Sequence, residues 1–119
     1  MPSDFLQFDV LWQDTLISTV SVNGLSVRLV NYDSRILLRP FGINTQIDIN
    51  DVYNFFLSRV IPPTRDGIET VLKAMGLTEY NPVAIARITH GILTDDYTWI
   101  RFKEDGNLTW NDVKYWKEG

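Results

Sequence analysis

Hydrophobic and polar residues alternate along the first part of the chain, a pattern typical of antiparallel β-strands. The run from Phe5 to Trp12 has the length of a strand, and Thr15 to Val22 is rich in β-branched residues. Asn23-Gly24 follows, and this dipeptide between alternating runs is a strong hairpin signal because both turn positions need a positive φ. The pattern therefore predicts a hairpin centred on Asn23-Gly24.

The third predicted strand begins at Leu25, with Leu25, Val27 and Leu29 on one face. Asp33-Ser34-Arg35 then predicts a turn. The run from Ile36 to Phe41 predicts a fourth short strand, so the first forty residues are expected to form a four-stranded meander.

The spacing of apolar residues then changes to the helical period. A helix is predicted from a cap at Asp48 or Asn50 to Arg59, and Pro62-Pro63 ends it. Thr64 is expected to cap a second helix that ends at Gly76.

Asn81-Pro82 predicts the start of a third helix, over Val83 to His90. Tyr97 to Phe102 predicts a late strand, and Leu108 to Trp116 a last short helix capped by Thr109 or Asn111. The predicted class is α+β, an N-terminal antiparallel β-meander followed by three short helices and a late strand, within one domain spanning residues 1–119.

Composition narrows the classes of protein that fit this pattern. The chain has 119 residues, of which 45% are hydrophobic and 22% charged, as in soluble globular domains. No apolar run is long enough to span a membrane, and Asp4 stands where a signal peptide would carry basic residues. The absence of cysteine excludes a disulfide framework. We therefore expect a cytoplasmic protein without a membrane partner.

The charge balance argues against direct binding of nucleic acid. The net charge is −4, and the basic residues are scattered rather than gathered into a run. Proteins that bind phosphate backbones usually present a concentrated basic face.

Few residues could carry catalysis. His90 is the single histidine, and we expect it to interact with the last carbonyls of the preceding helix. Asp95-Asp96 is expected to form a capping turn, while a Mg²⁺ site is the less favoured interpretation. No glycine-rich phosphate loop is present. The prediction is a protein that is not an enzyme and has no catalytic residue, metal site or cofactor.

Aromatic residues are abundant near the end of the chain. We expect Trp12 to be a core residue. Tyr97, Trp99, Trp110 and Trp116 allow two interpretations, a packed corner or a docking surface, since tryptophan and tyrosine dominate binding hot spots.

Three ordered sequence blocks resemble a known family. They are residues 58–67 (SRVIPPTRDG), residues 89–100 (THGILTDDYTWI) and residues 108–113 (LTWNDV). Together they resemble the N-terminal module of HipA-like Ser/Thr kinases, in its stand-alone, HipS-like form. The likeness covers about half of the chain, and Thr98 between Tyr97 and Trp99 departs from the family pattern.

This resemblance implies an α+β module that binds a HipA-like kinase and restrains it in the manner of an antitoxin. The kinase core that would bind ATP and Mg²⁺ is absent from this sequence, so phosphotransfer is not implied. The residues expected to bind the partner are Tyr97, Trp99, Trp110 and Trp116 as aromatic anchors, with Arg59 and Arg65 at the rim or in the framework. In the framework interpretation the two arginines pair with Asp66 or with Asp95-Asp96.

Two other interpretations remain open from the sequence. The chain could be a small inhibitor carried by a phage or another mobile element and directed at a different host or defence protein. It could also be the excised N-terminal part of a longer kinase.

Overall fold

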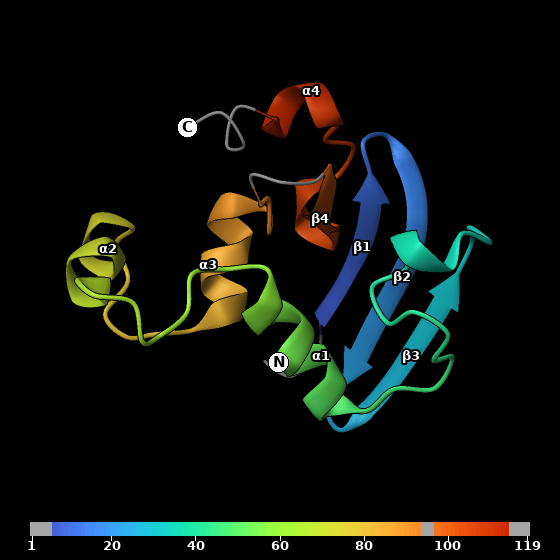
Figure 1. Ribbon diagram of the computed structural model, residues 1–119, viewed down its shortest axis with the longest axis horizontal. Helices are drawn as coiled ribbons and strands as arrows, with labels where there is room; N and C mark the ends of the chain where they lie inside the picture. Colours follow the sequence, from blue (N-terminus) through green and yellow to red (C-terminus); the bar gives the residue numbers. More distant parts are fainter. Residues whose placement is uncertain (1–5, 94–96, 115–119) are drawn as a thin grey trace.

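The computed structural model describes residues 6–93 and 97–114. Its sheet has four strands in the order β3-β2-β1-β4, with every neighbouring pair antiparallel (Figure 1). The strands are β1 (Leu6–Trp12), β2 (Thr15–Asn23), β3 (Ser26–Asn31) and β4 (Thr98–Phe102). The predicted α+β class is confirmed, with a meander first, helices next and a late strand that pairs with β1.

Helical elements fill the sequence between β3 and β4 and follow β4. They are η1 (Ile36–Leu38), α1 (Ile49–Ser58), α2 (Ile68–Ala74), α3 (Pro82–Thr89), η2 (Lys103–Asp105) and α4 (Trp110–Val113). Two predicted caps are confirmed, since the side chain of Asp48 accepts from the backbone of Asp51 and that of Asn81 from the backbone of Val83 and Ala84.

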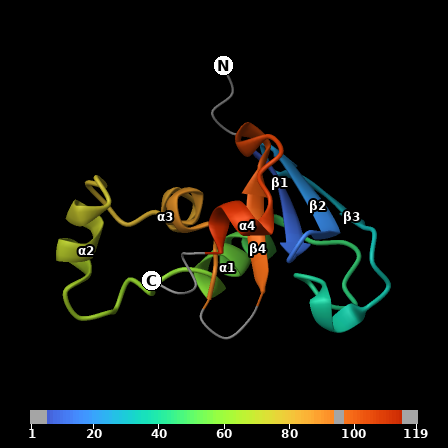
Figure 2. The ribbon, with the colours of Figure 1, turned by 90° about the horizontal axis from the view of Figure 1, so that it is seen from above.

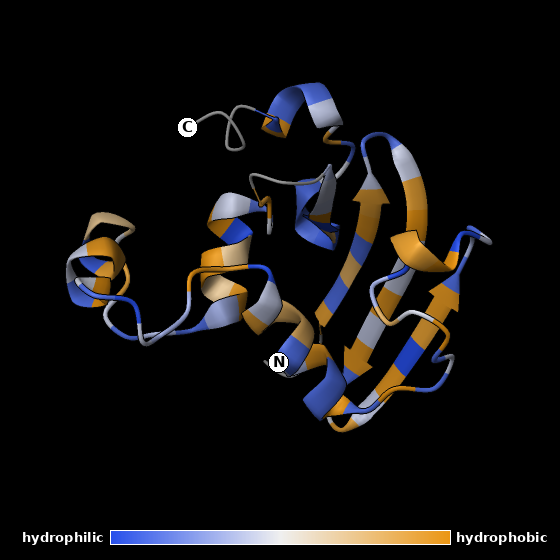
Figure 3. Cartoon of the chain, viewed as in Figure 1, coloured by the Kyte–Doolittle hydropathy of each residue, from blue (hydrophilic) through white to orange (hydrophobic). Residues whose placement is uncertain are grey.

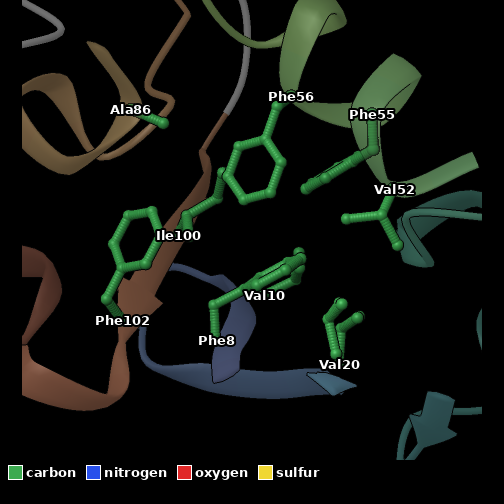
Figure 4. Packing of buried hydrophobic residues seen from close by; sticks show 10 residues of the cluster. Phe8, Val10, Val20, Val52, Phe55, Phe56, Ala86, Ile100 and Phe102 are labelled. Carbon is green, nitrogen blue, oxygen red and sulfur yellow. The ribbon is translucent and has the colours of Figure 1, made fainter. Parts of the chain in front are cut away.

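The main core lies between one face of the sheet and the helices α1 and α3. Figure 4 shows the ring of Phe8 beside Phe55 and Phe56 of α1, with Val10, Val20 and Ile100 around them. Phe8 meets Phe56 edge to face at 4.9 Å between ring centres. Alternation along the strands supplies these inward side chains.

A smaller cluster forms where α4 meets the sheet. It contains Leu11, Trp99 and Val113, with Leu16 and Trp110 packed against it. Leu11 and Trp99 alternate with Val10 and Ile100 of the main core, so they point to the opposite face of the strands. The short α4 covers this face near the β1–β2 turn.

The predicted fourth strand of the meander is wrong. Residues 36–38 form the 3-10 turn η1, in which Leu38 N–H donates to the carbonyl of Arg35 and Arg39 N–H to that of Ile36. Pro40 lacks the N–H that a strand would donate at that position. The fourth strand of the sheet is β4 instead, on the other side of β1.

Two local predictions also need correction. Asn23 belongs to β2 and pairs with Ser26, so Gly24 and Leu25 form the turn and Gly24 has the positive φ of 64°. The second helix is capped by Gly67 rather than by Thr64, because two turns precede it. In these turns the Arg65 N–H donates to the carbonyl of Pro62, and the carbonyl of Arg65 accepts from the N–H of Ile68.

The helix α2 lies apart from the sheet. Figure 2 shows α2, α3 and the sheet in succession, with α3 between the other two. Only Leu72 of α2 is buried. No helix in residues 6–93 and 97–114 is long and apolar enough to cross a membrane.

Candidate protein-binding surface

The turn between β1 and β2 determines the position of the late aromatic residues. Gln13 has an unusual positive φ of 52°. Its N–H donates to the carbonyl of Tyr97 at 3.0 Å, and its own carbonyl accepts from the indole Nε1 of Trp99 at 2.6 Å. The next residue, Asp14, accepts the backbone N–H of Trp110 at 2.8 Å. One turn therefore fixes the start of β4 and the start of α4.

This arrangement places three aromatic rings in a row. Tyr97 lies between Trp12 and Trp110, with ring centres 6.0 Å and 5.8 Å away and edge-to-face geometry on both sides. Tyr97 is exposed and the two tryptophans are half-buried. The expectation that Trp12 is a core residue is wrong, because the Trp12 ring lies at the surface in contact with Tyr97 and Arg35.

An open hollow continues this row. It has a volume of about 500 Å³ and is lined by Trp12 and by residues 34–38. Leu37 is 98% exposed beside it, and Figure 3 shows η1 as a hydrophobic element at the end of the sheet. A fully exposed leucine next to the half-buried Trp12 ring forms an apolar patch that a partner can cover.

An ion pair lies at the edge of the patch. The guanidinium of Arg35 lies 6.0 Å from the centre of the Trp12 ring and pairs with Asp33 at 2.8 Å. The side-chain and backbone hydrogen bonds from Arg35 lower the pKa of Asp33 from 3.8 to about 2, and the pairing raises the pKa of Arg35. We call Trp12, Arg35, Leu37, Tyr97 and Trp110 the aromatic corner.

The predicted aromatic anchors have different environments in the structure. Tyr97 and Trp110 lie together in the aromatic corner. Trp99 is 0% exposed and belongs to the core, so it corrects the expectation of a partner-binding ring at this position. Its place on the inner side of α4 explains the burial, because Leu11 and Val113 pack against it. Trp116 lies outside the described residues.

Arg59 has a structural position. Its side chain is buried, with Nε donating to the carbonyl of Gly91 at 2.9 Å and Nη2 to that of Thr98 at 2.7 Å. It therefore joins the end of α1 to the segment after α3 and to the first residue of β4. Arg65 is exposed in the turn before α2. The predicted partners Asp95 and Asp96 lie outside the described residues.

His90 is also structural, although its partner differs from the expected one. Its Nδ1 lies 3.1 Å from the carbonyl of Ile100, while its own carbonyl accepts the Ile100 N–H at 2.7 Å. Asp105 lies 3.6 Å from the same ring nitrogen. His90 has the left-handed φ of 58°, which turns its ring away from the last carbonyls of α3 and toward β4.

The three blocks of the family resemblance meet around β4. Arg59 of the first block bonds to Gly91 and Thr98 of the second. Val113 of the third packs in the same cluster as Trp99. Within residues 6–93 and 97–114, no group of three His, Asp or Glu side chains could hold a metal ion.

Comparisons with protein-family models, with curated proteins and with solved structures each find no match to this chain. The resemblance to HipA-like modules therefore stays a prediction carried by the three sequence blocks.

Sequence reasoning missed Trp12, Arg35 and Leu37 as surface residues. A usable signal was present in the run Ile36-Leu37-Leu38, three aliphatic residues with an arginine on each side and a proline soon after. A short apolar run that cannot extend as a strand has few ways to bury every side chain.

Proposed function

We propose that this chain is a non-catalytic interaction module that acts in the cytoplasm, binding a HipA-like Ser/Thr kinase and restraining it. The single observation that carries the binding role is the aromatic corner, where exposed Leu37 and Tyr97 adjoin two half-buried tryptophans and an arginine. Tryptophan, tyrosine and arginine are the residues that dominate binding hot spots. The identity of the partner rests on the three sequence blocks.

The corner is suited to binding because its parts are already held in place. Tyr97 is fixed by its carbonyl on Gln13, and Trp110 by its N–H on Asp14. Rigid aromatic side chains lose little conformational entropy when a partner covers them. The proposed restraint needs no catalytic group in this chain, only a stable complex.

The test uses a HipA-like kinase encoded beside the gene for this chain. Titration calorimetry measures binding of the purified proteins, and kinase autophosphorylation measures restraint. The double variant Tyr97→Ala/Trp110→Ala is expected to weaken binding by at least about 100-fold, since each hot-spot residue typically contributes about 2 kcal/mol or more. Restraint of autophosphorylation is expected to be lost in parallel.

The matched control is Tyr53→Ala, which removes a tyrosine of similar exposure on α1 (49%, against 42% for Tyr97). This variant should bind like the wild type. Circular dichroism establishes that each variant is folded. The proposal fails if the wild type does not bind the kinase, or if the double variant and the control bind equally well.

A further inference from the structure

The two edge strands, β4 and β3, differ in whether their outward-facing backbone groups are hydrogen-bonded. In an antiparallel ladder, alternate residues turn both their N–H and their C=O toward the same neighbour. On β4 the outward groups have partners, since Ile100 bonds with His90, Phe102 N–H donates to Asp105 at 2.8 Å, and the Thr98 carbonyl accepts from Arg59. Side chains from three other segments therefore close this edge.

The edge formed by β3 is open. Asn23 and Ser26 flank the two-residue turn, so Ser26, Arg28 and Val30 direct their backbone groups to β2. The backbone groups of Val27, Leu29 and Asn31 consequently face outward. Among the described residues, none bonds to the backbone of these three. An edge of this kind is a template for another strand.

Apolar side chains are exposed at both ends of β3. Leu25, in the turn before the strand, is 83% exposed, and Tyr32, directly after it, is 56% exposed. Arg28 is the only charged residue within β3, and the strand contains no proline. Figure 1 shows β3 on the outer side of the sheet, away from α2 and α3.

We propose that β3 pairs with β3 of a second copy of this chain, antiparallel and centred on Leu29. In this register Leu29 lies opposite Leu29 of the second copy, and Val27 lies opposite Asn31. All three outward-facing residues of each chain then receive hydrogen-bond partners. A two-fold axis through this pair makes the interface self-complementary.

The side chains select this register over its neighbours. Centring the pair on Arg28 would place the two arginines directly opposite, which is destabilising. Centring it on Val30 would place Val27 opposite Asp33, beyond the end of β3. Centring it on Leu29 places Arg28 opposite Val30.

The antiparallel direction has a further consequence at the ends. Ser26 falls opposite Tyr32 of the second copy, so the exposed Tyr32 of each chain meets the first residue of the other chain's β3. Parallel, in-register pairing would instead bring the two Arg28 side chains together. The residues of this edge are different from those of the aromatic corner, so the two proposals fail separately.

The absence of cysteine allows a direct geometric test. In Leu29→Cys, the two introduced residues would have Cα atoms about 5.5 Å apart, within the range of disulfides. In the control Ser26→Cys, the two cysteines would be offset by about 20 Å along the strands. Mild oxidation is expected to link Leu29→Cys into a covalent dimer and to leave Ser26→Cys monomeric. Equal cross-linking of both variants, or of neither, overturns the register.

Sedimentation equilibrium of the wild type tests the association itself. A dimer that dissociates on dilution is expected. Leu29→Pro removes a donor that faces outward and leaves the ladder to β2 complete, so it should raise the dissociation constant by at least about tenfold. A wild type that stays monomeric up to about 1 mM overturns the proposal. If Leu29→Pro does not fold, the wild-type measurement and the cysteine pair decide.

Discussion

Neighbouring aromatic residues in one strand segment have opposite roles. Trp99 is fully buried and bonded through its indole to Gln13, while Tyr97, two residues earlier, is exposed in the aromatic corner. Residues two apart in a strand share a face, so the difference comes from what covers that face. The helix α4 packs over Trp99 through Val113, and Tyr97 lies beyond this contact.

This difference predicts unequal effects on stability. Trp99→Ala is expected to lower the free energy of unfolding by about 3–5 kcal/mol, because it leaves a cavity in the smaller cluster. Tyr97→Ala should cost less, about 1–3 kcal/mol, because it removes two aromatic pair contacts of about 0.5–1.5 kcal/mol each at an exposed ring. Urea unfolding followed by circular dichroism measures both, and equal losses would contradict the assignment of Trp99 to the core.

Asp33 gives a prediction for the dependence on pH. Its folded-state pKa of about 2 lies below its ordinary value of 3.8, because Arg35 donates both side-chain and backbone hydrogen bonds to it. The pairing therefore stabilises the fold above about pH 4 and loses this contribution as the pH falls through 2. An NMR titration should give a carboxyl midpoint near 2, which Arg35→Ala should raise toward 3.8. A wild-type midpoint already near 3.8 would exclude the pairing.

At the scale of elements, one close crossing holds α1, α3 and β4 together. A Cβ added at Gly91 would lie 2.8 Å from Cδ1 of Ile100 and 3.2 Å from Cβ of Arg59. The Arg59 guanidinium bonds to the carbonyl of the same glycine. The backbone at Gly91 therefore has room only for glycine.

Gly67 supplies the control for this crossing. Its φ of 76° and ψ of 16° are left-handed, and nothing lies within 4 Å of an added Cβ. Gly67→Ala should cost about 1–2 kcal/mol, the strain of the left-handed conformation alone. Gly91→Ala should cost about 1–3 kcal/mol more, since overpacking adds to that strain. Thermal unfolding of both variants measures the difference, and equal transition temperatures would contradict the close packing.

Across the whole molecule, stability is expected to differ between the sheet and α2. The helix α1 buries Val52, Phe55 and Phe56 in the main core, whereas α2 buries only Leu72. Segments with few buried apolar contacts open locally at low free energy. Hydrogen exchange should therefore be much faster in α2 than in α1 or β1. Exchange at the same rate in α1 and α2 would show that α2 is held more firmly than its burial indicates.

The sequence by itself determined the features that depend on local chemistry. The caps Asp48 and Asn81 were predictable because each side chain bonds only to the following turn of its own helix. The strands β1 and β2 and the class of the fold were predictable from alternation. A framework role for Arg59 was one of the two interpretations that the sequence allowed, but its bonding partners, the carbonyls of Gly91 and Thr98, were not predicted.

Only the tertiary structure decided which neighbour each element receives. Residues 36–41 have the composition of a strand, but the N–H groups of Leu38 and Arg39 bond within their own turn and Pro40 has none, so the fourth strand is β4, beside β1. The partial exposure of Trp12 and the burial of Trp99 follow from where α4 and η1 lie, which periodicity does not specify. Hydrophobic attraction is non-directional. A sequence pattern therefore shows which residues are apolar, while the packing of distant elements decides which of these apolar side chains are buried.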